Sequence, residues 1–232
     1  MKEEVALPDI SRCISKFKQT FKHVAEAEFA KLLADATVTA YKKGEFVYEE
    51  NSRVKGCYLL YSGIVKIFQT GNEGKEQIIR LGKEGDLFGF RSVIREEPAC
   101  TSVETLADCI LCHVPGRSLV EAITRSPAFA NEMMQIACRE LGDANRYIKD
   151  IAQKPVRARL AEILLLIAGD FGLEKDGALT LNLTRGDLSN FVGTATETLI
   201  RLLSEFKNER LIATRGRRIR LLDVDRLRLI AG

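Results

Sequence analysis

The chain has 232 residues, of which 46% are hydrophobic, so it can form one large or two small domains with a core of their own. The longest apolar run, residues 163–168, is far too short to span a bilayer, and the charged start lacks the apolar stretch of a signal peptide, so we expect a cytoplasmic protein with no membrane partner. The net charge of +3 is uneven, because residues 153–232 hold 14 Lys and Arg against 10 Asp and Glu, whereas residues 1–152 hold 21 against 22.

Two patterns follow one another in the first half of the chain. Residues 8–35 are typical of helix, with an amphipathic stretch at residues 21–33. Residues 36–114 contain short apolar and aromatic runs separated by glycine or polar turns. Many short strands with regularly placed turns predict a sandwich or barrel, which can enclose a small ligand.

The cysteines and histidines give little support for a metal site. Cys109 and Cys112 have the C-x-x-C spacing of metal ligands, but they lie in a predicted strand, where residues three apart face opposite sides. We interpret all six cysteines as reduced core thiols. His23 and His113 lie far apart and beside no pair of carboxylates, which disfavours a cupin-like metalloenzyme; haem binding stays open.

A long helix is predicted from about residue 126 to residue 152. Apolar residues recur along it at spacings of four and three, namely Met133, Ala137, Leu141, Ala144, Ile148 and Ile151. This seam packs either on the barrel or on the same helix of a second copy, and we favour the homodimer. Pro155 is expected to end the long helix, with a hinge near residues 153–155. An apolar helix is expected at residues 158–171.

Residues 184–206 have the layout of a helix-turn-helix. Thr184 is suited to cap the first helix, with Asp187 as its acidic partner three residues later. Gly193 stands where that helix must end, because glycine adopts the left-handed conformation without a steric penalty. Thr194 is suited to cap the second helix, with Glu197 three residues later. The inward faces would consist of Leu188, Phe191, Val192, Leu199, Leu202, Leu203 and Phe206.

The outer face of the second helix carries the candidate base-reading residues Thr196, Glu197, Ile200 and Arg201. The Arg201 guanidinium matches two guanine acceptors, Glu197 can accept from the cytosine amino group, and Ile200 can contact a thymine methyl. Alternative roles remain: Glu197 can complete a capping box or pair with Arg201, and Ile200 can be an isolated surface residue.

Residues 212–222 predict a two-stranded hairpin that turns near Gly216 and carries arginine on both sides. A basic hairpin beside a helix-turn-helix is a wing, whose arginines can bind phosphates, although an ordinary solvated hairpin has the same pattern. We expect DNA phosphate contacts from Thr184, Arg185, Thr194, Thr198, Arg215, Arg217 and Arg218. The chain then divides into a sensor domain at residues 1–152 and a DNA-binding domain at residues 153–232.

Several motifs of both domains occur in one order. The barrel contains Lys43-Gly44-Glu45, Tyr61-Ser62-Gly63, Gly74-Lys-Glu and Gly85-Asp86-Leu-Phe-Gly89, and the second domain contains Leu183-Thr-Arg-Gly-Asp-Leu and Arg201-Leu-Leu. With these motifs, nearly the whole chain resembles the Crp/Fnr family of bacterial transcription regulators.

The resemblance implies an α+β fold with an antiparallel β-roll (jelly-roll, cupin-like) effector domain, a long dimerisation helix and a C-terminal winged helix-turn-helix domain. It also implies a non-enzymatic homodimer that reads a palindromic TGA-type site through Glu197 and Arg201, with RNA polymerase as a further partner. Ile200 stands where the oxygen-sensing branch has serine, so we expect the base neighbouring the TGA to differ.

The identity of the effector stays open. The cyclic-nucleotide branch is similar in the barrel but has a glutamate where this chain has Phe90, and an Arg-Ser or Arg-Thr pair where it has Cys100-Thr101. Burying a phosphate without a cation is unfavourable, so we do not expect cAMP to bind. The oxygen-sensing branch binds an iron–sulfur cluster through cysteines, most of them near the N-terminus. Cys112 stands at the place of the internal cysteine ligand of that branch, but Cys13 is the one cysteine near the N-terminus, so a four-thiolate cluster is not expected.

A candidate effector pocket would consist of Phe88, Gly89, Phe90, Cys100, Thr101, Ala144 and Asn145. Such a lining suits an apolar effector, haem or another small molecule. Two alternatives compete with a ligand-responsive regulator: a regulator that acts without an effector because its pocket is degenerate, and, more weakly supported, a cupin-like enzyme.

Overall fold

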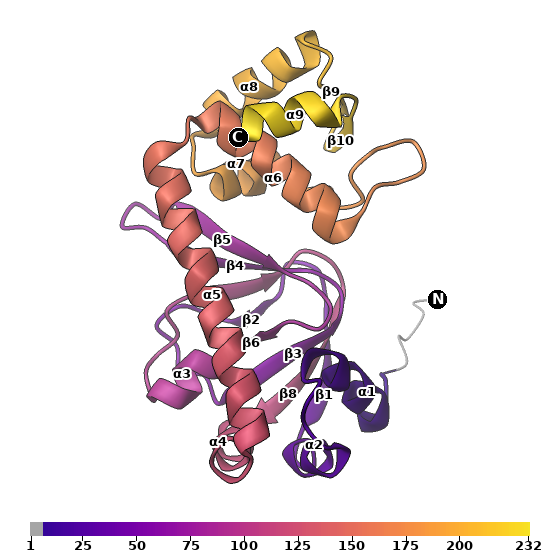
Figure 1. The fold of residues 1–232 in the computed structure, drawn as a ribbon. Coiled ribbons are helices and arrows are strands. Elements are labelled where there is room, and N and C mark those ends of the chain that lie inside the picture. The colour runs from indigo at the N-terminus through magenta and orange to yellow at the C-terminus, as the bar shows by residue number, and fades with distance from the viewer. Residues whose placement is uncertain (1–6) are drawn as a thin grey trace. The chain divides into compact units, whose positions relative to one another are not determined.

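The computed structural model describes residues 7–232, which form two compact units. The first unit contains residues 7–70 and 80–143, and the second contains residues 71–79 and 144–232. The elements of each unit, except β7 (Ser102–Thr105), are labelled in Figure 1. The boundary predicted at residues 152 and 153 coincides with the end of the long helix, whereas the chain divides into its two compact units between residues 143 and 144, within that helix.

The first unit is built on two four-stranded antiparallel sheets, ordered β1-β8-β3-β6 and β2-β7-β4-β5. Their strands are β1 (Thr37–Tyr41), β2 (Phe46–Tyr48), β3 (Gly56–Ser62), β4 (Val65–Thr70), β5 (Glu76–Gly82), β6 (Leu87–Phe88), β7 (Ser102–Thr105) and β8 (Cys109–Pro115). The predicted antiparallel β-roll is confirmed.

Alternation along β8 separates two cores. Cys109 and Leu111 face a cluster inside the roll, whereas Cys112 and Val114 face a second cluster formed with the surrounding helices. This is the arrangement expected for a strand whose successive side chains point to opposite faces. The prediction that Cys109 and Cys112 point to opposite sides is therefore confirmed.

Helices cover one side of the roll. They are α1 (Ile10–Thr20), α2 (Glu26–Leu32), α3 (Phe90–Arg95), α4 (Gly116–Arg125) and the first part of α5 (Pro127–Gln153). The predicted helical region at residues 8–35 is thus interrupted between α1 and α2, where Phe21 stacks on Phe129 of α5 with ring centroids 5.2 Å apart. Neither α3 nor α4 was predicted, because both are short and take much of their stability from packing.

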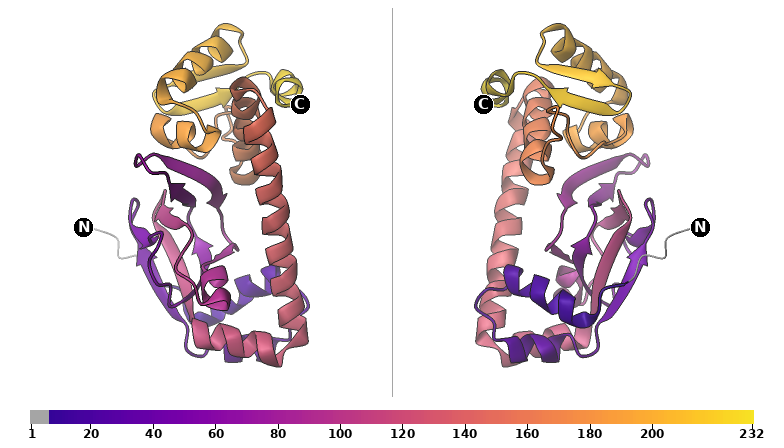
Figure 2. Two further views of the ribbon diagram at one scale, coloured as in Figure 1. Left: turned by 90° about the vertical axis from the view of Figure 1, so that its left-hand side faces the viewer. Right: turned by 90° about the vertical axis from the view of Figure 1, so that its right-hand side faces the viewer.

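The second unit is a helical domain with a small hairpin. Its elements are α6 (Val156–Phe171), α7 (Arg185–Val192), α8 (Thr196–Asn208), β9 (Ile212–Arg215), β10 (Arg218–Leu221) and α9 (Val224–Ala231). The predicted long helix, apolar helix, helix-turn-helix and hairpin are confirmed, and α9 is additional. Both views in Figure 2 place the β9–β10 hairpin beside α8. Among residues 7–232, no helix is both long and apolar enough to cross a membrane.

Candidate DNA-binding surface and sensor pocket

The start of α7 is fixed by its capping residue. The Thr184 hydroxyl oxygen accepts a hydrogen bond from the Asp187 backbone N–H at 3.0 Å, and the hydroxyl donates to the Asp187 carboxylate. This confirms the predicted cap, which satisfies an otherwise unpaired N–H of the first turn. Thr184 therefore holds the helix terminus, and its hydroxyl is already engaged before any phosphate approaches.

The turn between the two helices differs from the prediction in one respect. Gly193 has a φ of 71° as expected, but α8 begins after Ala195, which offers no side-chain cap. The Thr194 backbone N–H closes the end of α7 by bonding to the Ser189 carbonyl at 3.1 Å. The prediction that Thr194 caps α8 is therefore wrong. The Thr196 hydroxyl lies 3.0 Å from the Ser189 hydroxyl, so Thr196 joins the two helices instead of standing free for a base.

Arg159 of α6 is a positioning residue that the sequence did not indicate. Its guanidinium donates to the carbonyl oxygens of Val192 at 2.9 Å, Gly193 at 3.1 Å and Lys154 at 2.8 Å. A cation at the end of a helix compensates carbonyls that lack intrahelical partners. Arg159 thus fixes the turn that sets the orientation of α8. This role could not be predicted from local sequence patterns, because Arg159 lies far from Gly193 along the chain.

The two faces of α8 are clearly divided. Leu199, Leu202, Leu203 and Phe206 are buried, as predicted, whereas Ile200 is 49% exposed. The Arg201 side chain is 66% exposed and forms an ion pair with Glu205 at 2.7 Å. Arg201 therefore projects outward, and its partner is not Glu197.

Glu197 lies on the same exposed side of α8. Within residues 7–232, its carboxylate forms no hydrogen bond or ion pair. Both alternative roles weighed for Glu197, a capping box and a pair with Arg201, are absent from that part of the chain. A carboxylate acceptor and a guanidinium donor are thus exposed one helical turn apart.

The wing is anchored by Arg185. Its guanidinium donates to the Gly216 carbonyl oxygen at 2.8 Å, which joins the start of α7 to the turn of the β9–β10 hairpin. Partial burial lowers the pKa of Arg185. We expected Arg185 to contact phosphate, but the structure gives its guanidinium a role in holding the wing.

The wing arginines are not equivalent. Arg218 is held by Glu174 and by Asp176, the latter at 3.0 Å, so its charge is already compensated. Arg215 and Arg217 are exposed, and no ion pair is recorded for either within residues 7–232. Arg220 is a further exposed wing arginine that the prediction left out, while Thr194 and Thr198 are half-buried.

The apolar seam of α5 is shifted by one residue at its start. Met133 is 4% exposed and packs in the core of its own unit, so the prediction that it belongs to the dimer seam is wrong. Met134 at 63%, Leu141 at 62% and Ile148 at 64% are exposed instead, seven residues apart. Ala137 is exposed and Ala144 half-buried, and Ile151 is 38% exposed. Seven-residue spacing is the repeat of a coiled-coil seam.

The residues of the predicted effector pocket belong to different parts of the fold. Phe88 belongs to the core inside the roll, whereas Phe90 packs with the helices in the other core. Gly89 between them has a φ of 82°, which reverses the chain direction. Cys100 and Thr101 are half-buried in the first unit, and Ala144 and Asn145 belong to the second unit.

A half-buried ion-pair network joins Arg80 of β5 to two carboxylates. The Arg80 guanidinium lies 3.2 Å from the Asp86 carboxylate and 2.9 Å from the Glu140 carboxylate of α5. Burial raises the pKa of Glu140, and the nearby Arg80 opposes that shift. The positive charge of Arg80 is therefore already shared between two carboxylates of the chain itself.

Two buried thiols and both imidazoles are engaged within the first unit, whereas Cys138 is exposed and Cys100 half-buried, so the prediction that all six cysteines are core thiols is wrong for these two. Cys13 and Cys112 are buried and share a hydrogen bond, which lowers the pKa of Cys13 and raises that of Cys112. His23 Nδ1 lies 2.5 Å from the Glu132 carboxylate, and the His113 ring lies 4.9 Å from the Tyr58 ring. No group of three His, Cys, Asp or Glu residues suited to a metal ion occurs among residues 7–232.

A helix-turn-helix with an exposed recognition face and a basic wing, following a β-roll, defines a DNA-binding regulator. Residues 38–126 match the cyclic nucleotide-binding domain, and residues 158–230 match the Crp-like helix-turn-helix domain. Electron transport regulator A of Shewanella oneidensis is 28% identical over 193 residues, which cover 82% of this chain and 77% of that protein.

Two further relatives agree. The CRP-like cAMP-activated global transcriptional regulator of Mycobacterium tuberculosis is 26% identical over 209 residues, which cover 89% of this chain and 93% of that protein. The solved structure of FixK2 from Bradyrhizobium japonicum matches with a TM-score of 0.76 and 25% identity, covering 85% of this chain and 98% of that one. The chain belongs to the Crp/Fnr family and is a DNA-binding transcription regulator, not an enzyme.

Proposed function

We propose that this regulator binds as a homodimer to a palindromic DNA site with TGA-type half-sites, and that a small effector other than a cyclic nucleotide controls it. The observation that carries the proposal is the outer face of α8, where Glu197 is unengaged and Arg201 is 66% exposed on its side chain. Arginine can donate two hydrogen bonds to guanine, and a carboxylate can accept from the cytosine amino group. We leave Thr196 out of the base-reading set because Ser189 engages its hydroxyl.

Selection of binding sites from random DNA tests this reading. We expect the purified full-length protein to enrich sites that contain two inverted TGA-type half-sites about one helical turn apart, since dimeric readers place their recognition helices at that spacing. Ile200, which is 49% exposed, should favour a thymine methyl next to the TGA element. Enriched sites that lack a TGA-like core would refute the assigned roles of Glu197 and Arg201.

The homodimer rests on the seven-residue repeat of Met134, Leu141 and Ile148 on the exposed side of α5. Large apolar side chains at this repeat become buried when two such helices pair. Leu141→Glu should convert the dimer to a monomer in sedimentation and abolish tight binding to the palindrome, because a carboxylate in the seam would lose its water. Gln135→Glu, an added charge at an exposed position of α5 outside this repeat, is the matched control and should leave the dimer intact.

The exclusion of a cyclic nucleotide is supported by the compensated Arg80 and by Cys100 at the place of the family's arginine. A cyclic phosphate would have to displace Asp86 or Glu140 from Arg80 in order to gain a cation. Calorimetric titration with cAMP should therefore give no saturable binding in the micromolar range. Micromolar affinity would overturn this part of the proposal.

We propose that the protein is cytoplasmic, because a transcription regulator must reach the DNA it binds. We also propose that, once bound at its site, it changes the activity of RNA polymerase at the neighbouring promoter. Transcription in vitro from a template that carries the selected palindrome at different distances from the promoter tests this partner. Output should change with protein only when the palindrome is intact. An unchanged output at every distance would contradict the proposed action on the polymerase.

A further inference from the structure

The first unit contains a pocket that lies outside the predicted effector residues. It has a volume of about 530 Å³ and opens between β1 and the segment of residues 47–55. Its walls include Thr37, Thr39, Tyr41, Tyr48, Lys55, Tyr58 and His113, and none of its lining residues comes from residues 88–101 or from α5. Small-molecule sites in proteins commonly have volumes of roughly 300–1,000 Å³.

The floor of this pocket is a row of side chains set by strand register. Thr37 on β1 is paired with His113 on β8, and His113 with Tyr58 on β3. Phe88 on β6 is paired with Tyr58 but does not line the pocket. Cross-strand partners lie on the same face of a sheet. The Tyr58 ring lies 4.9 Å from the His113 ring and stacks on Phe88 at 5.9 Å.

The opposite sheet contributes one more ring. Tyr48 of β2 lies 5.9 Å from Tyr58 and 6.3 Å from Phe88, measured between ring centroids. A Cβ at Gly56 would lie 2.5 Å from Nε2 of His113, so glycine at this position leaves the space that the imidazole occupies. The rings are thus held in place by both sheets, and they offer a preformed surface for a flat partner.

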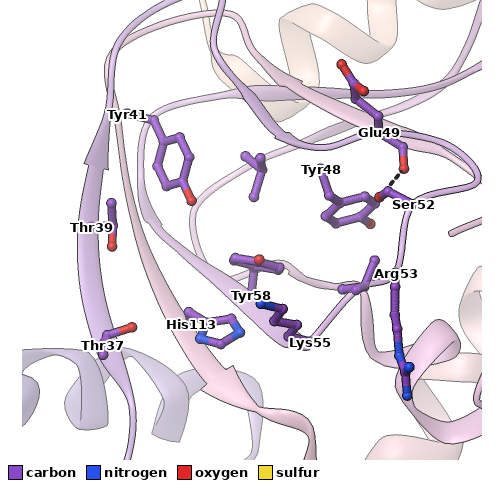
Figure 3. A pocket seen from close by; sticks show the side chains of 12 residues that line it. Thr37, Thr39, Tyr41, Tyr48, Glu49, Ser52, Arg53, Lys55, Tyr58 and His113 are labelled. Atoms are coloured by element: carbon purple, nitrogen blue, oxygen red, sulfur yellow. Dashed lines mark hydrogen bonds between the residues drawn. The ribbon is translucent and has the colours of Figure 1, made fainter. Parts of the chain in front are cut away.

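The charge of the pocket comes from one side chain. In Figure 3, the Lys55 side chain extends toward the floor formed by Tyr58 and His113, whereas the Arg53 guanidinium and the Glu49 carboxylate point away. Within residues 7–232, no ion pair is recorded for Lys55. Burial raises the pKa of Tyr58 to about 12 and lowers that of His113, so both rings are neutral near pH 7.

Hydroxyl groups line the side opposite Tyr48. Figure 3 shows the Tyr41 and Thr37 hydroxyls directed toward the open space of the pocket. An occupant therefore meets flat neutral rings, hydroxyl donors and acceptors, and one ammonium group. A planar ring gains from contact with the aromatic faces, and an anionic substituent gains a charge-assisted hydrogen bond from the ammonium group.

We propose that this pocket binds a small aromatic carboxylate, with the ring against Tyr48 and Tyr58 and the carboxylate on Lys55. The inference deepens the proposed function, on which it rests only for the claim that the occupant acts as the effector. Tyr48 offers a route for that effect, because its hydroxyl shares a hydrogen bond with Thr101 and lies near Glu140 of α5. Glu140 is next to Leu141 of the dimer seam.

Calorimetric titration of the full-length protein with benzoate tests the site itself. We expect saturable binding with one site per chain. Cyclohexanecarboxylate, which keeps the charge without the flat ring, and benzyl alcohol, which keeps the ring without the charge, should each bind at least about tenfold more weakly, because each lacks one of the two contacts. Equal binding of cyclohexanecarboxylate, or no saturation by benzoate up to millimolar concentration, would overturn the proposal.

Paired variants locate the site. Lys55→Gln should weaken benzoate binding at least about tenfold, because a charge-assisted hydrogen bond is lost. Arg53→Gln is the matched control: it removes an equal charge from the same segment, but its guanidinium points away in Figure 3, so affinity should stay within about twofold. Equal losses in both variants would indicate a general effect of positive charge and would refute this location.

A further variant plugs the pocket without touching the core. Thr37 is exposed on the edge strand β1, so Thr37→Trp can fill the space above His113 without repacking the interior. Benzoate binding should be lost while the circular dichroism spectrum and DNA binding without ligand persist. Retained benzoate binding in this variant would refute the site. DNA affinity measured with and without benzoate then separates the two proposals, because specific DNA binding without any response to benzoate removes only the effector role.

Discussion

The two units of this chain use their charged side chains in opposite ways. In the first unit, Arg80 is paired with two carboxylates of the chain and holds strand β5 to α5. In the second unit, Arg201, Arg215 and Arg217 project outward, and Arg201 forms an exposed ion pair with Glu205. The comparison indicates that a DNA-binding surface consists of arginines whose guanidinium groups remain exposed to solvent. Arginines that bind carboxylates or carbonyls of the chain stabilise the fold instead.

The same distinction exists within the second unit. Arg159 and Arg185 bind backbone carbonyls that position the turn and the wing, and Arg218 is compensated by Glu174 and Asp176. Substituting an engaged arginine should therefore affect stability, and substituting an available one should affect DNA binding. Each prediction below tests one side of that comparison.

The largest effect is expected from Arg159→Ala. The carbonyls of Val192 and Gly193 would lose a charged donor, so the free energy of unfolding of the DNA-binding domain should fall by about 3 kcal/mol. Arg159→Lys is the control, since it keeps the charge but cannot reach several carbonyls with one planar fork, and it should recover part of the loss. Scanning calorimetry measures both. An unchanged transition in Arg159→Ala would contradict the positioning role.

Arg201→Ala should have the opposite effect: it should weaken DNA binding and leave the free energy of unfolding almost unchanged. Loss of the base contact proposed for Arg201 should weaken binding to the selected palindrome by about 1–3 kcal/mol relative to unrelated DNA. Unfolding should hardly change, because the exposed pair with Glu205 contributes only about 0.3–0.5 kcal/mol. Fluorescence anisotropy at fixed salt gives the affinities, with Lys207→Ala in the last turn of the same helix as the control. Equal loss on both kinds of DNA would remove Arg201 from the base-reading set.

The two wing arginines provide a finer comparison. Arg217→Ala should lower the slope of log affinity against log salt by about 1, because one phosphate contact is lost. Arg218→Ala should lower it less, since Glu174 and Asp176 already neutralise that charge. Binding measured across a salt series decides between them. If the two variants have the same slope, the compensation of Arg218 does not persist on DNA.

The smallest effect concerns His113 in the first unit. Burial holds the pKa of His113 below its usual value near 6.5, so at acid pH the unfolded chain binds a proton that the folded chain resists. The stability of this unit should therefore be complete above about pH 6.5 and decrease as the pH falls below it. Near-ultraviolet circular dichroism of the tyrosines can follow thermal unfolding, because the chain has no tryptophan and four of its five tyrosines lie at residues 41–61.

His113→Gln should remove this part of the pH dependence and leave the stability near neutral pH lower or unchanged. The comparison is between two slopes, so a uniform loss of stability does not obscure it. Identical slopes for the variant and the natural chain would show that another group is responsible.

The sequence by itself determined the DNA-binding half of the protein. Thr184, Gly193 and the apolar spacing of α7 and α8 act over one or two helical turns, so local patterns sufficed to place the helices and their outer face. The wing and the long helix were equally predictable, because a glycine turn between short strands and a sustained apolar repeat are local signals as well.

Only the tertiary structure decided which polar groups are available. Met134 instead of Met133 faces outward because the packing of α5 on Phe21 and its neighbours fixes the rotation of the helix. Arg159 contacts Gly193, and His113 lies between Thr37 and Tyr58, through pairings of segments far apart in the chain. Such contacts depend on strand register and helix packing, where a shift of one residue exchanges the inner and outer faces.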